Sequence, residues 1–291
     1  MFYNNYVISG LTISQESYYN VALFSYAESA NFSNITLEDV DVTGYEEVGG
    51  LIGNAINCNI DNCHVSGSVE GISVYGNIGG LVGKITETTV SNCSSECNVS
   101  GVNNVGGLAG MLYDNNNVIY CYATGDVTGR DWYTGGLVGL AGGDESIIKE
   151  CYATGNVTGV SGVGGLAGQV HTIIDCYALG DVTGSGERIG GLVGQNGGPI
   201  ENCYSAGHVT ADIPIDRYPG GMVGFYNGGY NITGCYYDKD TSGMSDNTGK
   251  GTPKTTEEMK QQATYADWDF YNIWDIDEGA SYPFLRWENI K

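Results

Sequence analysis

Short apolar runs alternate with glycines along most of the chain. One such run is Gly-Gly-Leu-Ala-Gly at 106–110, and it is followed by Cys-Tyr-Ala-Thr-Gly-Asp-Val-Thr-Gly at 121–129. In the second run the apolar Cys121, Ala123 and Val127 are interleaved with Tyr122 and polar residues. This alternation is typical of a half-buried β-strand, and the flanking glycines are typical of turns. The pattern predicts two short strands in each unit.

The two runs recur at regular spacing. The glycine-rich run starts at residues 49, 79, 106, 135, 164, 190 and 220, and the second run starts at the cysteines 63, 93, 121, 151, 176, 203 and 235. The unit is therefore roughly 28 residues long. Residues 21–44 form a copy without the paired glycines, and Tyr6–Ile13 predicts one further strand pair. We expect the repeats to begin near residue 6.

A unit this short cannot bury its own apolar face, so it must stack on its neighbours. The predicted fold is an all-β parallel β-solenoid of about eight rungs, which gives a rod about 40 Å long. Glycine pairs in every unit disfavour a helical repeat. We divide the chain into degenerate N-terminal rungs at 1–47, seven repeats at 48–234 and a C-terminal cap at 235–291.

The C-terminal segment predicts a different structure. Thr255-Thr256-Glu257-Glu258 matches a capping box, which predicts a short helix through about residue 263. Aromatic residues follow at 268, 270, 274, 282, 284 and 287. Because a solenoid end exposes strand edges and core, we expect a small helix-plus-strand cap here.

The paired runs resemble the GLUG-motif repeat, whose core is Gly-Gly-Leu-x-Gly followed by Cys-Tyr-Ala-x-Gly-x-Val-Thr-Gly in this chain. The resemblance implies a non-catalytic module at the surface of a bacterium or archaeon, because such repeats occur in large adhesins and beside the catalytic part of IgA-specific metallopeptidases. In that family the position of Cys here is often Ser. The histidines, His64, His171 and His208, do not form the His-Glu-x-x-His zinc motif of those peptidases.

The net charge of the chain limits the classes of partner that we expect. The formal net charge is −23, with 11 Lys and Arg against 34 Asp and Glu, so nucleic acid is excluded as an expected partner. No apolar run approaches the ~18 residues of a membrane span, so we expect no membrane insertion. The start at Met1 shows no secretory signal, yet an extracellular or cell-surface location is expected from the resemblance.

The nine cysteines are mostly in one column of the repeat. A column of small identical side chains indicates inward packing, since buried Cys behaves as a small hydrophobe. We expect free buried thiols, with disulfides between adjacent rungs as the alternative.

Tyrosines beside this column should point outward, because strand side chains alternate. They form a predicted aromatic ladder of Tyr122, Tyr152, Tyr177 and Tyr204. The ladder either stabilises the sheet by stacking or binds sugar rings or a partner chain.

A candidate calcium loop begins at Asp238. Oxygen ligands at Asp238, Asp240 and Ser242 precede the turn residue Gly243, as in the first half of a calcium loop. The twelfth position is Gly249 instead of the bidentate Glu, so we expect no cofactor with calcium as the alternative.

Three functions are compatible with these patterns. The first is a non-catalytic scaffold or adhesin module that binds a surface glycan or protein. The second is a subunit that assembles with copies of itself through apolar columns expected to be exposed at Val138, Ala167 and Val193. The third is a carbohydrate-active β-helix enzyme, which would need clustered acidic and basic residues on a groove.

Overall fold

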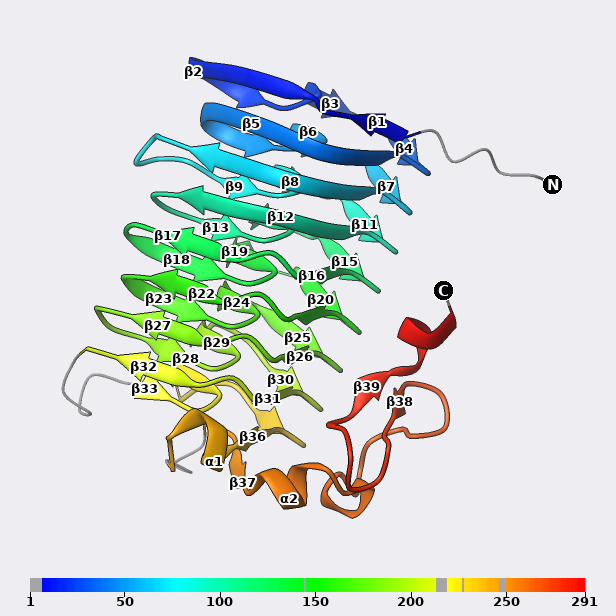
Figure 1. Cartoon of the computed structure of the whole chain (residues 1–291), viewed down its shortest axis with the longest axis vertical. Coiled ribbons are helices and arrows are strands. Elements are labelled where there is room, and N and C mark those ends of the chain that lie inside the picture. The colour runs from blue at the N-terminus through cyan, green and yellow to red at the C-terminus, as the bar shows by residue number, and fades with distance from the viewer. Residues whose placement is uncertain (1–6, 144, 213–218, 227, 246–249, 291) are drawn as a thin grey trace.

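The computed structural model describes residues 7–143, 145–212, 219–226, 228–245 and 250–290. It shows a rod of stacked rungs that starts at β1 and ends in a cap, with the C-terminal segment turned back along one side (Figure 1). The expected start at Tyr6 and the loop position Gly249 lie outside the described residues.

Three sheets run along the rod. Two sheets contain eight strands each, so the predicted all-β parallel solenoid of about eight rungs is confirmed. The first eight-stranded sheet consists of β3 (Phe24–Glu28), β6 (Ile52–Ile56), β10 (Val82–Thr86), β14 (Ala109–Tyr113), β19 (Val138–Ala141), β24 (Ala167–Val170), β29 (Val193–Asn196) and β34 (Val223–Phe225). The second consists of β4 (Asn31–Ser33), β7 (Asn59–Asp61), β11 (Thr89–Ser91), β15 (Asn117–Ile119), β20 (Ile147–Lys149), β25 (Thr172–Ile174), β30 (Ile200–Glu201) and β35 (Ile232–Thr233).

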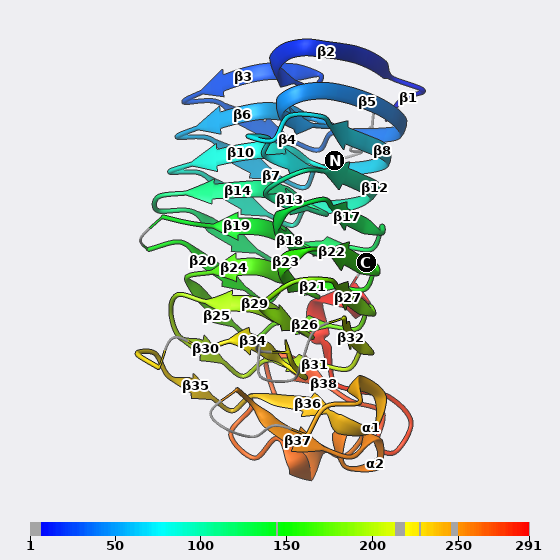
Figure 2. The same cartoon turned by 90° about the vertical axis from the view of Figure 1, so that its left-hand side faces the viewer.

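The third sheet has 21 strands and bends around the remaining sides of the rod (Figure 2). Its N-terminal members are β1 (Val7–Ser9), β2 (Thr12–Val21), β5 (Thr36–Gly49), β8 (His64–Gly71), β9 (Ile78–Gly79), β12 (Ser94–Gly101) and β13 (Val105–Gly106). The middle members are β16 (Tyr122–Ala123), β17 (Val127–Gly129), β18 (Trp132–Gly135), β21 (Tyr152–Ala153), β22 (Val157–Gly159) and β23 (Ser161–Gly164). The C-terminal members are β26 (Tyr177–Ala178), β27 (Val182–Gly184), β28 (Ile189–Gly190), β31 (Tyr204–Ser205), β32 (Val209–Ala211), β33 (Pro219–Gly220), β36 (Tyr236–Asp238) and β37 (Thr252–Lys254).

The expectation of two strands in each unit was wrong. The segment between the two runs also forms a strand, such as β20, which pairs in parallel with β15 and β25. These strands have at most one buried side chain, for example Ile148 between Ile147 and Lys149, and no glycine marks them. A three-residue strand with one inward side chain is too short to produce a clear sequence period.

The core is continuous from the first rungs to the cap. Its central column, at 0 to 1% exposure, is Leu51, Leu81, Leu108, Leu137, Leu166, Leu192 and Met222. Val138, Ala167 and Val193, which were expected to be exposed, are also 0% exposed. The chain bends at Gly136 and Leu137 between β18 and β19, so consecutive residues on either side of the bend both face inward. The apolar columns proposed for self-assembly are therefore core, and that basis for a filament is overturned.

The cap follows β36. It contains α1 (Lys239–Ser242), α2 (Thr256–Met259), two short 3-10 helices at Gln262–Thr264 and Arg286–Ile290, and an antiparallel pair of β38 (Trp274–Asp275) and β39 (Phe284–Leu285). The capping box is present, because Thr255 Oγ1 accepts from Glu258 N and Glu258 Oε2 accepts from Thr255 N. The helix ends four residues earlier than expected and continues as a 3-10 turn.

The cysteine column forms a hydrogen-bonded ladder inside the rod. All nine cysteines are free and buried, as expected. Each thiol of the column donates to the carbonyl two residues earlier, for example Cys151 Sγ to Lys149 O at 3.1 Å. Four of these thiols also accept from the backbone N–H of the cysteine in the preceding rung, as Cys151 Sγ does from Cys121 N at 3.4 Å. The thiol thus satisfies a backbone N–H that no strand carbonyl reaches.

Glycines at the central bend should not tolerate a side chain. A Cβ on Gly136 would overlap the carbonyl oxygen of Gly165 and lie 2.9 Å from the Cβ of Ala153. We expect Gly136→Ala to lower the free energy of unfolding by about 1–3 kcal/mol, because the next rung would have to move. Urea unfolding would measure this loss, with Gly229→Ala as the control because nothing lies within 4 Å of its added Cβ. Equal midpoints for the two variants would contradict the close stacking.

The buried thiols should be unreactive. Burial raises the pKa of the Cys97 thiol to about 12 and raises the pKa of Cys121 well above its ordinary value. Burial also acts to raise the pKa of Cys176, but hydrogen bonds with Cys151 and Cys203 lower it to about 6. Because all nine side chains are buried, the reagent cannot reach them, and we expect none to react with Ellman's reagent at the rate of an exposed thiol in the native protein. In denaturant without reductant all nine should react, and a lower count would show disulfides.

Candidate functional site

Each rung turns sharply at the residue that precedes the cysteine column. This residue has a left-handed backbone conformation, with φ between 49° and 62°. The corner column consists of Asn34, Asn62, Asn92, Tyr120, Glu150, Asp175, Asn202 and Gly234. Asn and Gly adopt this conformation most readily, whereas Tyr and Glu do so at a cost. Because the following Cys points inward, the corner side chains lie on the surface of the rod.

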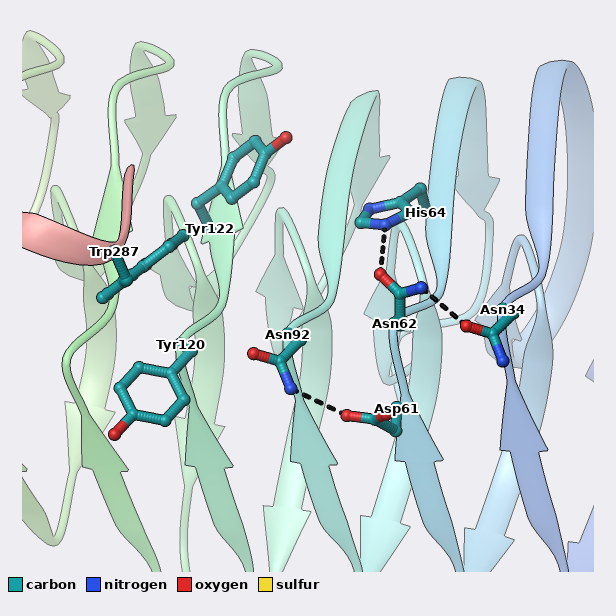
Figure 3. A pocket seen from close by; sticks show the side chains of 8 residues that line it. All are labelled: Asn34, Asp61, Asn62, His64, Asn92, Tyr120, Tyr122 and Trp287. Atoms are coloured by element: carbon teal, nitrogen blue, oxygen red, sulfur yellow. Dashed lines mark hydrogen bonds between the residues drawn. The ribbon is translucent and has the colours of Figure 1, made fainter. Parts of the chain in front are cut away.

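A groove of about 720 Å³ lies over the N-terminal half of this corner column (Figure 3). Its described lining residues are Asn34, Asp61, Asn62, His64, Asn92, Tyr120, Tyr122 and Trp287. Figure 3 shows the corner residues Asn34, Asn62, Asn92 and Tyr120 on successive strands, so the groove runs along the rod axis.

The floor of the groove is a row of hydrogen-bonded polar side chains. Asn62 Nδ2 donates to Asn34 Oδ1 at 2.7 Å, and Asn62 Oδ1 lies 3.1 Å from His64 Nε2. Asn92 Nδ2 donates to Asp61 Oδ1 at 2.8 Å. Two of these contacts join neighbouring rungs and one lies within a rung, and together they hold the polar groups at fixed positions.

The predicted aromatic ladder is present. Ring centroids of consecutive tyrosines from Tyr122 to Tyr204 lie 5.1, 5.0 and 5.1 Å apart, and the interplanar angles are 7°, 5° and 12°. Stacking of the rings therefore stabilises this face of the sheet.

The C-terminal segment covers much of the ladder. Tyr177 and Tyr204 are only 3% and 0% exposed. The Tyr177 hydroxyl donates to the Glu288 carboxylate at 3.0 Å, and the Tyr204 hydroxyl donates to Pro283 O at 2.6 Å. An open platform made of all four tyrosines is therefore corrected to a ladder that emerges from the cap at Tyr152 and Tyr122.

Three tryptophans attach the cap to the corner column. Their indole N–H groups donate to three of its residues: Trp287 to Glu150 O at 3.1 Å, Trp274 to Asp175 Oδ1 at 3.2 Å, and Trp268 to Gly234 O at 2.8 Å. Burial raises the pKa of both Glu150 and Asp175. The cap therefore occupies the C-terminal half of the corner column, and the groove is the uncovered half of the same surface.

The edge of the cap forms one wall of the groove. The Trp287 ring stacks on Tyr152 at 5.7 Å and lies 6.4 Å from Tyr122. Tyr120, which is 37% exposed, meets Trp287 edge to face at 6.2 Å and 72°. One end of the groove is thus aromatic and the other end is polar.

The candidate calcium residues have a different arrangement from a calcium loop. Asp238 is 0% exposed and caps α1, because its Oδ1 accepts from Asp240 N and Thr241 N. Its Oδ2 accepts from the Thr256 and Tyr282 hydroxyls, both at 2.6 Å. Asp240 Oδ2 accepts from Thr256 N, and Ser242 Oγ accepts from Met244 N. Protein donors thus surround the oxygens that were assigned to calcium, and the segment is one turn of helix instead of an extended loop.

Sequence reasoning found part of the groove. Tyr122 and its stacking partners were predicted, whereas the corner asparagines and Trp287 were missed. The repeated Asn immediately before Cys, at Asn62, Asn92 and Asn202, was the available signal for the corner. No local signal places Trp287, because it lies 137 residues from its hydrogen-bond partner Glu150.

Comparison with known proteins confirms the repeat. The model of the family described as the GLUG motif matches residues 44–70, 131–158 and 185–210, so the chain contains GLUG repeats. A stretch of 105 residues is 43% identical to a candidate Gly-rich membrane protein of Evansella cellulosilytica, and it covers 34% of this chain and 12% of that protein. The chain thus spans about an eighth of the length of this relative.

A solved structure shows the same fold. The crystal structure of a candidate immunoglobulin A1 protease from Bacteroides ovatus aligns over 98% of this chain and 76% of that chain, with a TM-score of 0.51 and 20% identity. At this identity the likeness concerns architecture alone.

The described residues contain neither a membrane-spanning helix nor a cluster of metal ligands. No helix among them is long and apolar enough to cross a membrane. Within the same residues, no group of three His, Cys, Asp or Glu side chains is arranged to hold a metal ion.

Asp238 should stabilise the cap. Burial acts to raise its pKa, but hydrogen bonds from Thr256, Tyr282 and two backbone amides outweigh burial and hold the pKa below its usual value. We expect Asp238→Asn to destabilise the cap by about 1–3 kcal/mol at pH 7, since bonds to a charged acceptor are lost. Tryptophan fluorescence would report this, because Trp268, Trp274 and Trp287 all lie in the cap.

The loss of stability caused by Asp238→Asn should depend on pH. The pKa of Asp238 is lower in the folded protein than in the unfolded chain, where it is about 3.9. Its ionised carboxylate therefore stabilises the fold fully above that unfolded pKa, and this stabilisation is lost as the pH falls through the folded pKa. The difference between wild type and Asp238→Asn should therefore shrink below about pH 4. Asp267→Asn, on an exposed cap carboxylate, is the control. A difference that stays constant down to pH 2 would contradict the ionised role of Asp238.

Proposed function

We propose that this chain is a non-catalytic extracellular module of a bacterial or archaeal surface protein, which binds a ligand on another surface through the groove. The observation that supports this most is the groove itself, where the aromatic ladder emerges beside an ordered polar row. Repeat solenoids commonly bind partners along their extended surfaces. The GLUG repeats and the similarity to a candidate Gly-rich membrane protein of Evansella cellulosilytica support a surface location.

The chemistry of the groove favours binding over catalysis. Asp61 is the only carboxylate among the described residues that line it, and glycoside hydrolysis generally uses two. Asp61 Oδ1 also accepts from Ser91 Oγ at 2.7 Å and from Asn92 Nδ2 at 2.8 Å. These two bonds fix the Asp61 carboxylate against the neighbouring rung, which favours a role in positioning its neighbours.

Adhesion of beads coated with the chain would test the proposal. The groove variant is Tyr120→Asn with Tyr122→Ser, which places at both positions the residues that the preceding rung holds, Asn92 and Ser94. Tyr75→Ser is the control, because Tyr75 is 75% exposed and lines a different hollow. Retention on bacterial cell walls, mucin or extracellular matrix should fall about tenfold for the groove variant, the effect of losing about 1.4 kcal/mol of binding.

Three outcomes would contradict the proposal. They are equal retention of wild type and groove variant, absence of retention on every surface, and release of reducing ends or unsaturated sugars from polysaccharides by the wild-type chain. Retention of the Tyr75→Ser beads at the wild-type level is required for the comparison to support a role of the groove.

A further inference from the structure

We infer that the groove binds a neutral glycan chain that lies along the rod axis, with one sugar ring stacked on Tyr122 and its hydroxyls bonded to the corner asparagines. This inference rests on the proposed function and specifies the ligand of the same groove. Three features of the described residues support it: the end of the tyrosine ladder, the polar row and the distribution of charge.

The tyrosine ladder ends at Tyr122 with a step. Tyr152 stacks on one face of the Tyr122 ring at 5.1 Å, whereas the residue in register on the preceding rung is Ser94. The Ser94 hydroxyl lies 2.8 Å from His64 Nδ1, so this small side chain belongs to the polar row. Tyr122 is therefore the last ring of the stacked row, and it lines the groove beside the small Ser94 side chain. The apolar C–H face of a sugar ring packs on such a face by dispersion and by attraction of its polarised hydrogens to the π-system.

Two further rings bound the same end of the groove. Trp287 lies 6.4 Å from Tyr122 at 34°, and Tyr120 lies 6.2 Å from Trp287 at 72°. The hydrogen bond from Trp287 Nε1 to Glu150 O fixes the indole on the rod. A planar, partly apolar ligand unit therefore meets aromatic surface from more than one direction.

The polar row repeats along the axis as the hydroxyl groups of a glycan do. An amide side chain offers two donors and an acceptor with two lone pairs, and the contacts within the row involve one donor and one acceptor site of Asn62. Hydroxyls both donate and accept, so they match amides better than a purely acidic or basic ligand would. Because rungs stack in parallel, Asn34, Asn62 and Asn92 present this pattern at successive rungs.

Charge selects a neutral ligand. The chain has a formal net charge of −23, and the described lining of the groove includes Asp61 but no Lys or Arg. An anionic polysaccharide would be repelled both at long range and at the floor of the groove. A partner peptide that inserts a tryptophan would imitate the cap. The cap tryptophan Trp274, however, packs on the rings of Tyr177 and Tyr204, and in the groove the same column holds Ser94 and His64.

Calorimetric titration of the whole chain with hexasaccharides of cellulose, chitin, mannan and laminarin would test the inference, with hexagalacturonate as the anionic comparison. We expect at least one neutral hexasaccharide to bind and hexagalacturonate not to bind.

Tyr122→Ser should weaken binding about fivefold, as expected for loss of one aromatic stacking contact. Tyr120→Asn should also weaken it while keeping the native fold, because Asn is the residue found at this corner in three N-terminal rungs. Tyr271→Ala, on a cap ring that is 87% exposed, should bind as wild type.

The inference is overturned if hexagalacturonate binds more tightly than every neutral sugar, if no neutral sugar binds, or if Tyr122→Ser binds as tightly as wild type while circular dichroism shows both folded. Groove-dependent adhesion of beads without neutral-sugar binding would reject the glycan and leave the proposed function in place. Sugar binding without adhesion would reject the surface role and leave the groove assignment.

Discussion

The left-handed corner before the cysteine column determines what this molecule presents to solvent. At each corner the chain must reverse side-chain direction within two residues, and the thiol ladder makes this possible. Cys121 illustrates the bonding, because its Sγ donates to Ile119 O at 3.2 Å and its backbone N–H donates to Cys151 Sγ at 3.4 Å. A buried side chain that both donates and accepts is required here, since an apolar residue would leave the corner amide without a partner. A serine hydroxyl both donates and accepts, so it would meet the same requirement.

Because the corner is fixed, the residues on both sides of each cysteine become surface columns. The preceding column contains the asparagines of the groove, and the following column contains His64, Ser94 and the stacked tyrosines. The cap attaches to the C-terminal half of these columns through Trp287, Trp274 and Trp268. The ligand surface and the cap-binding surface are therefore one continuous feature, which changes from aromatic to polar between Tyr122 and Ser94.

The sequence was sufficient for the architecture because the glycine-rich run marks a bend that only glycine tolerates. It was insufficient for the number of strands, since β20 and its equivalents have one inward residue each. It placed the tyrosine ladder correctly from alternation alone. The sequence pattern placed Val138 wrongly on the surface, because the alternation of inward and outward side chains does not continue through the bend at Gly136 and Leu137. The sequence also could not place Trp287 on Glu150, because that contact depends on the path of the whole cap. The acidic residues at Asp238 and Asp240 fitted a calcium pattern, but the same residues cap a helix, and local spacing does not separate these roles.

Hydrogen–deuterium exchange of the whole chain, with and without the neutral hexasaccharide that binds best, tests the central claim most directly. We expect added protection in the segments around Asp61–His64, Tyr120–Tyr122 and Arg286–Glu288, which come from separate parts of the sequence and meet only at the groove. The hollow around Tyr75 and Trp132 should show no change. Protection confined to that hollow or to the cap helices, or no protection at saturating sugar, would contradict the claim that the end of the tyrosine ladder is the binding site.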